Sequence, residues 1–116
     1  MMARDIHPVL DDIIETIALI ENAVQGKTRD DFGRDRLLGL GIQRAIEIIS
    51  EASRHIPDEL LQHAPEIPWR SIRGIGNILR HEYHHIADDV IWDVVLYDLP
   101  PLKAAVQSLQ TKAAEE

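Results

Sequence analysis

The sequence predicts an all-α protein, a small antiparallel bundle of four to five helices. Apolar residues recur every three or four positions along almost the whole chain, as on one face of a helix. No segment alternates between apolar and polar residues over more than four positions, as a half-buried strand would. With 116 residues, the chain is predicted to be one domain, 1–116, with a flexible tail at about 111–116.

The first helix is predicted to run from about Asp5 to Gly26. Asp5 is a suitable N-cap, Pro8 falls in the first turn, and Gly26 is a typical stop. After this helix, Thr28 and Asp31 have the spacing of a capping box, which predicts a short helical turn. The apolar stripe of the helix steps by four and three residues and consists of Ile6, Leu10, Ile13, Ile17, Ile20 and Val24.

Three further helical segments follow, and short connections between them favour antiparallel neighbours. The second long helix ends at Pro57, and residues 58–63 add one more turn. A third helix is predicted over 69–81, and a fourth over 88–109 with an interruption near its two prolines, Pro100 and Pro101. The stripe of the second helix consists of Leu38, Ile42, Ala45, Ile49, Ala52 and Ile56.

Composition excludes several classes of function. The absence of cysteine excludes disulfides, zinc–thiolate sites and a thiol nucleophile. The N-terminal MMARDIHPVLDD is too acidic for a signal peptide, and no apolar run approaches the ~20 residues of a membrane span. A cytoplasmic protein that does not enter the membrane is therefore expected.

The charge is unevenly distributed. The net charge of −8 argues against non-specific attraction to nucleic acid or acidic lipid. Residues 68–87, however, contain three arginines and three histidines against the single acidic residue Glu82. If the protein binds phosphate, this segment is expected to bind it.

The segment WRSIRGIGNILRHEYHHI, residues 69–86, carries the candidate chemistry. As a helix it would bury one apolar face and present on the other Arg73, Asn77, Arg80 or His81, and His84. Guanidinium and imidazole groups together can bind a phosphate and move a proton near neutral pH. The alternative is an ordinary solvated stripe. The histidines lack matching ligands elsewhere, so no metal is predicted.

This segment and its neighbours resemble the HepT-like branch of the HEPN superfamily. The resemblance covers nearly the whole chain. It includes DIHPVLDDIIETI near the N-terminus, AIEIISEAS (45–53), NILRHEY (77–83) and VIWDVVLYDLPPLKAAV (90–106). The last two together are the more specific part of the match.

The resemblance implies the toxin of a type VII-like toxin–antitoxin pair. Such a toxin is a homodimeric endoribonuclease that needs no metal or cofactor and cleaves RNA, for example tRNA or mRNA, in a cleft built by both subunits. His81 would shuttle a proton, an arginine would stabilise charge on the phosphate, and Asn77 is the polar residue of the motif. The antitoxin would be an MNT-type nucleotidyltransferase that transfers AMP to Tyr83.

The sequence departs from the family motif at its arginine. The motif separates that arginine from the histidine by four to six residues, which corresponds to Gly76, Ile75 or Gly74 before His81, and alignment places it at Gly76. Either Arg73 or Arg80 can supply the guanidinium instead, and the sequence does not decide between them.

Three further residues are candidates for the same cleft. Glu47 and Glu51, one turn apart, either orient the arginine or form an exposed pair. His84 would add positive charge below about pH 6.5. The departure at Gly76 leaves a second hypothesis open. In it, the chain is a catalytically weak or inactive subunit that binds a nucleotide or a minimal nucleotidyltransferase.

Overall fold

The computed structural model describes residues 5–82 and 87–115, and the predicted all-α bundle is confirmed over these ranges, which contain no strand. The predictions for Tyr83 and His84 fall outside the described residues. The helices are α1 (His7–Val24), α2 (Arg29–Arg34), α3 (Arg36–Ser53), α4 (Asp58–Leu61), α5 (Trp69–Glu82), α6 (Asp88–Asp93), the π-helix η2 (Val94–Asp98) and α7 (Leu99–Ala114).

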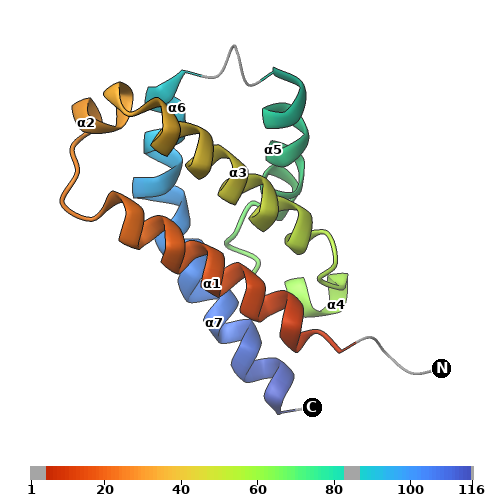
Figure 1. Ribbon diagram of the computed structural model, residues 1–116. Helices are drawn as coiled ribbons and strands as arrows, with labels where there is room; N and C mark the ends of the chain where they lie inside the picture. Colours follow the sequence, from red (N-terminus) through yellow and green to blue (C-terminus); the bar gives the residue numbers. More distant parts are fainter. Residues whose placement is uncertain (1–4, 83–86, 116) are drawn as a thin grey trace.

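Helix α3 lies at the centre of the bundle. It packs against α1 on one side and against α5 on another, and α1 packs in turn against α7 (Figure 1). Helices α6, η2 and α7 follow one another as a single long rod behind α1 and α3 (Figure 1). Because α5 contacts mainly α3, its remaining surface is available to solvent or to partners.

The core is aliphatic, as the composition predicts. One aromatic contact supplements it, where the rings of Phe32 and Trp92 join α2 to α6 at a centroid distance of 5.2 Å. Within the described residues, no helix is long and apolar enough to cross a bilayer. The most deeply buried aliphatic side chains include Leu10, Ile13, Ile17, Ile20, Leu79, Ile91, Val106 and Leu109.

The start of α1 differs from the prediction. The N-cap position belongs to Ile6, not to Asp5, and makes no side-chain capping bond. Instead, the Asp5 carboxylate accepts a 3.0 Å hydrogen bond from the His7 amide and lies 2.9 Å from Nδ1 of the His7 ring. These hydrogen bonds hold the pKa of Asp5 below its usual value.

The local signals between α1 and α2 are confirmed. Gly26 has φ +75°, in the left-handed region that ends helices and favours glycine. The capping box that begins α2 is closed in both directions. The Asp31 amide donates to Thr28 Oγ1 at 3.1 Å, and the Thr28 amide donates to the Asp31 carboxylate at 2.9 Å.

Helix α3 ends at Ser53, three residues before the predicted end at Ile56. Residues 54–56 form a turn in which the Ile56 amide donates to the Ser53 carbonyl at 3.2 Å. Ile56 remains in the core, with only 1% of its surface exposed. The apolar periodicity thus follows the core beyond the point where the helix stops.

The rod at the C-terminus corrects two predictions. The irregularity is the π-helix η2, immediately before Pro100 and Pro101, while the prolines themselves occupy the first turn of α7. Proline suits the first turn of a helix because its fixed φ is already helical. In addition, α7 continues to Ala114, so most of the predicted tail, 111–116, is helical.

Candidate functional site

Helix α5 buries one face and exposes the other, as its sequence predicts. Trp69 and Leu79 are 8% and 1% exposed, and the Trp69 indole N–H donates to the Ala64 carbonyl at 2.9 Å. The side chains of Asn77, Arg80 and His81 are exposed. Three of the four residues predicted to act on RNA therefore lie on the accessible part of α5.

Arg73 is the fourth predicted residue. It leaves α5 on nearly the same side as Arg80, but its side chain is held against the rest of the chain and is only 30% exposed. It crosses to the C-terminal end of α3, where Nη2 donates to the Ile56 carbonyl at 2.7 Å and Nε donates to the Ser53 carbonyl at 3.3 Å. Its nearest carboxylate, Asp58, is 3.6 Å away. A guanidinium suits this place because the last carbonyls of a helix lack partners within the helix. Arg73 is thus held as a cap for α3.

Arg80 lies in a surface hollow formed by α1, α3 and α5. We call this the Arg80 hollow; its volume is about 430 Å³. Within the described residues, the Arg80 guanidinium makes no hydrogen bond or ion pair. The lining residues are Val9, Asp12, Arg44, Glu47, Ile48, Glu51, Ala52, His55 and Arg80. Of the two candidate arginines, Arg80 is therefore the one available to a ligand.

Glu47 and Glu51 both line the Arg80 hollow, but the ion pairs of their carboxylates are with Arg44, Arg54 and His55. Glu47 is the more enclosed, with 15% of its side chain exposed, and its carboxylate lies 3.5 Å from the Arg44 guanidinium. Glu51 is 54% exposed and lies 3.4 Å from Arg54 and 3.8 Å from the His55 ring. The hollow thus combines acidic and basic groups, and the ion pairs at its rim are exposed and individually weak.

His81 points to a different side of α5 from Arg80. Consecutive helical residues are separated by about 100° around the axis, so the His81 side chain leaves the helix well away from the hollow. Asn77 lies one turn before His81 and shares its stripe. Within one chain, the predicted arginine and histidine therefore lie on adjoining faces of α5.

Sequence reasoning missed three polar members of the hollow, Asp12, Arg44 and His55. His55 had a detectable signal, because Glu51 and His55 stand four residues apart and face the same side of α3. Asp12 had none, since its position depends on how α1 packs against α3. In the described ranges, no three histidine or acidic side chains converge as a metal site would require.

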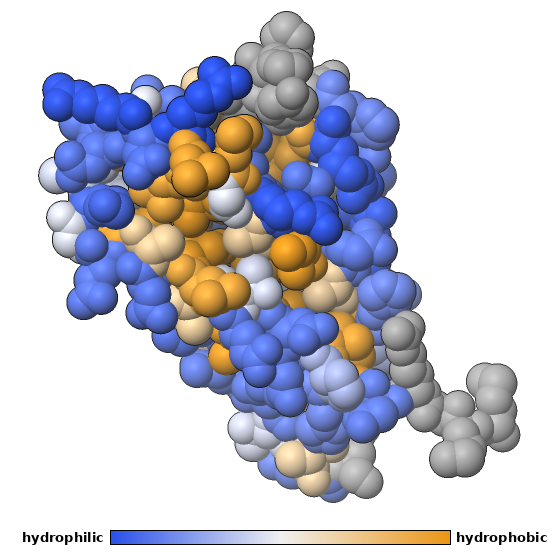
Figure 2. Space-filling model, in the orientation of Figure 1, coloured by the Kyte–Doolittle hydropathy of each residue, from blue (hydrophilic) through white to orange (hydrophobic). Residues whose placement is uncertain are grey.

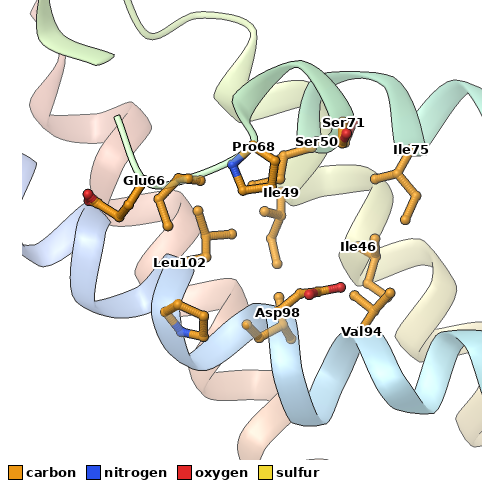
Figure 3. Close-up of a pocket in the computed structure, with 14 residues that line it drawn as sticks. Ile46, Ile49, Ser50, Glu66, Pro68, Ser71, Ile75, Val94, Asp98 and Leu102 are labelled. Atoms are coloured by element: carbon orange, nitrogen blue, oxygen red, sulfur yellow. The ribbon is translucent and has the colours of Figure 1, made fainter. Parts of the chain in front are cut away.

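A second cavity, of about 200 Å³, lies between α3, α5, η2 and α7. Ile46, Val94 and Leu102 line it from three different helices (Figure 3). Two carboxylates, Glu66 and Asp98, are also among its lining residues. The walls are predominantly apolar, so this cavity does not have the cationic character that a phosphate site needs.

The face formed by α1 and α3 exposes apolar side chains, which Figure 2 shows in orange. Leu37 and Leu19 are 80% and 67% exposed, and Leu40 and Ile48 are partly exposed. A shallow groove between the two helices is lined by Leu19, Leu37 and Ile48. Because Ile48 lines both this groove and the Arg80 hollow, the two features adjoin.

The fold and the exposed side chains define a small all-α domain that presents guanidinium and imidazole groups from one helix. The family model of HepT-like ribonucleases matches residues 13–109. The chain belongs to this family.

Three curated relatives match this chain over nearly their whole length. A protein of Thermococcus cleftensis named "Probable ribonuclease HepT" is 37% identical over 94% of this chain and 99% of its own. A Methanocaldococcus jannaschii protein named "Putative RNase" is 32% identical over 92% of this chain and 98% of its own. A similarly named protein of Caldanaerobacter subterraneus is 30% identical over 91% and 95%. No solved structure matches the chain.

Proposed function

We propose that this protein is a metal-independent endoribonuclease and the toxin subunit of a toxin–antitoxin pair. The observation that carries the proposal is the exposed half of α5. In a chain of the HepT-like ribonuclease family, Asn77, Arg80 and His81 are all accessible there. His81 supplies the proton transfer and Arg80 the positive charge beside the phosphate. The RNA substrate supplies the nucleophile.

The reaction is a transesterification within the RNA. The 2′-hydroxyl oxygen attacks the neighbouring phosphorus, and the neutral His81 imidazole accepts its proton. The bond from phosphorus to the 5′-oxygen breaks, and that oxygen takes a proton from the imidazolium. The products are a 2′,3′-cyclic phosphate and a 5′-hydroxyl. A guanidinium beside the phosphate stabilises the charge that develops in the transition state.

The active form proposed here is a homodimer. His81 and Arg80 lie on adjoining faces of one helix, so two copies of α5 facing each other would combine the histidine of one chain with the arginine of the other. Apolar residues beside these groups support such pairing, because Leu40 is 43% and Ile78 46% exposed. A symmetric pair would create two equivalent half-sites in a single cleft.

The proposed partner is a minimal nucleotidyltransferase of the MNT type. It would act as antitoxin by transferring AMP from ATP to the hydroxyl of Tyr83, two residues after His81. A bulky nucleotide so close to the histidine would block RNA from the cleft. This role rests on the family motif, since Tyr83 lies outside the described residues.

One observation favours a second function, a non-catalytic subunit that binds a nucleotide or the transferase. The position where the family motif has its arginine is occupied by Gly76, which is buried against α3. A site without that arginine would bind phosphate through Arg80 and would cleave RNA slowly or not at all.

RNA cleavage in the presence of EDTA tests the proposal. Wild-type protein should cleave a tRNA pool, and His81→Ala should lower the rate by roughly a hundredfold or more. His63→Ala is a matched control, because His63 is an exposed histidine that is not part of α5. Equal rates for wild type and His81→Ala would exclude the proposed mechanism.

The second function gives a different pattern. Neither wild type nor His81→Ala would cleave, and incubation with the transferase and ATP would add the mass of AMP to the wild type. The Tyr83→Phe variant would not gain that mass. An unmodified wild type would count against the AMP-transfer role in either function.

A further inference from the structure

The contact between α3 and α5 leaves no room for a side chain at Gly76. A Cβ atom at this position would lie 2.8 Å from Ser50 Oγ and 2.9 Å from Ser50 Cβ. Both distances are shorter than real Cβ contacts allow. The hydroxyl oxygen can rotate away, but Ser50 Cβ is fixed to the α3 backbone. An alanine at position 76 would therefore force the two helices apart.

The Ser50 hydroxyl also bonds the two helices together. It accepts a 3.1 Å hydrogen bond from the Gly76 amide and donates a 3.1 Å hydrogen bond to the Arg73 carbonyl. Ser50 is only 1% exposed, so these bonds are shielded from water. Rotating the hydroxyl to relieve a clash would break both of them. The Gly76 amide would lose a buried bond, whereas the Arg73 carbonyl would keep the 2.9 Å bond from Arg54 Nε.

Gly74 provides the internal comparison. It lies in the same helix, two residues earlier, and a Cβ atom added there would meet nothing within 4 Å. The lack of room for a side chain is therefore specific to position 76 and is not a general property of the glycines in α5.

Arg80 lies one turn after position 76 and faces the same side of α5. The third atom near a Cβ at position 76 is the Glu47 carbonyl oxygen, at 3.5 Å, and Glu47 also lines the Arg80 hollow. A side chain from position 76 would thus begin beside the residue that borders Arg80. Positions 76 and 80 therefore face the same region of the surface, beside the Arg80 hollow.

We infer that Ser50 closes position 76 to any side chain, and that Arg80 takes the phosphate-binding role that an arginine at position 76 would have. The second part rests on the proposed ribonuclease function. Without the Ser50 side chain, a Cβ atom at position 76 would meet only the Glu47 carbonyl oxygen, at the ordinary van der Waals distance of 3.5 Å, so a side chain at this position is tested in that background.

Thermal unfolding tests the closure without reference to activity. Gly76→Ala should lower Tm by about 5 °C or more in the wild-type background. In the Ser50→Gly background, the same substitution should be neutral or stabilising, as the control Gly74→Ala should be in both backgrounds. An equal loss from Gly76→Ala in both backgrounds would overturn the inference that Ser50 closes the position.

RNA cleavage tests the exchange of arginines. Arg80→Ala should slow the wild type roughly tenfold or more. The double variant Ser50→Gly with Gly76→Arg should cleave faster than wild type, and Arg80→Ala should slow it less than it slows the wild type. An undiminished effect of Arg80→Ala in the double variant would overturn the second part. Absence of cleavage in all variants would reject the proposed function, while the Tm comparison would still decide the role of Ser50.

Discussion

The two halves of helix α5 differ in how fully the rest of the chain holds them. From Trp69 to Gly76 the helix is tied to its surroundings by the indole of Trp69, the guanidinium of Arg73 and the amide of Gly76. From 77 to 82 the exposed side chains Asn77, Arg80 and His81 have none of these ties.

The comparison shows that residue type alone does not assign a role. Arg73 and Arg80 stand seven residues apart, at nearly the same angle around one helix. The α3 carbonyls are within reach of Arg73, whereas Arg80 faces the hollow beside Glu47. The first arginine therefore holds the bundle together, and the second is left for a ligand.

The largest expected effect comes from truncating Leu79, the buried side chain in the second half of α5. Leu79 is 1% exposed, and Leu79→Ala should lower the free energy of unfolding by about 3 kcal/mol through lost burial and a cavity. Urea unfolding measures this loss. Ile78→Ala is the control, because Ile78 is 46% exposed and its truncation should cost far less. Equal losses of unfolding free energy in the two variants would mean that Leu79 does not hold the second half of α5 in place.

The next largest effect comes from the first half of α5, where Arg73 is bonded to the end of α3 and Arg70 is exposed. Arg73→Ala should destabilise the protein by about 2 kcal/mol, because two carbonyls of the α3 end lose a charged donor. Arg70→Ala, at an exposed position of the same helix, should change stability by less than about 0.5 kcal/mol. Urea unfolding of both variants is the measurement, and a harmless Arg73→Ala would refute the capping role.

Arg80→Ala should have little effect on stability and a measurable effect on RNA binding. We expect a change in unfolding free energy within about 0.5 kcal/mol. The salt dependence of single-stranded RNA affinity should become shallower by about 0.7 in its logarithmic slope, the value for one lost phosphate contact. Binding titrations over a range of salt concentrations check this. An unchanged slope would show that Arg80 does not contact phosphate.

The smallest effect concerns the capping box of α2, formed by Thr28 and Asp31. This box lies outside α5 but, like the first half of α5, is held by hydrogen bonds. The backbone and side-chain hydrogen bonds of Thr28 lower the pKa of Asp31. Because the folded pKa is the lower one, this stabilisation is present above the unfolded pKa and is lost as pH falls through the folded pKa. The stability difference between wild type and Asp31→Asn should therefore shrink on acidification, measured by urea unfolding at pH 7 and pH 3. A difference independent of pH would refute this assignment.

The sequence predicts most of the fold because its signals are local. The apolar stripes locate α1, α3 and α5, Gly26 marks the turn after α1, and Thr28 with Asp31 begins α2. Each of these signals acts within about one or two helical turns. None needs knowledge of how the helices pack.

The candidate site is less predictable because it depends on contacts between helices. The capping role of Arg73 requires that the end of α3 lie beside α5, and the closure of Gly76 requires Ser50 opposite it. Spacing within α5 shows only that Arg73 and Arg80 share a face. The early end of α3 and the length of α7 were likewise set by packing that periodicity does not reveal.

The π-helix η2 holds about one residue more than an α-helix of the same length would. Along the C-terminal rod, the buried side chains Ile91 in α6, Val95 in η2 and Leu99 in α7 are four residues apart, and these eight residues exceed the about 7.2 residues in two turns of an α-helix. The wider turns absorb the excess, as the bond from the Leu99 amide to the Val94 carbonyl shows. Deleting one residue within 94–98 would convert this stretch to ordinary α-helix and leave the buried stripe of α7 facing inward. The same deletion in the middle of α7 would turn everything after it by about 100° and expose the stripe.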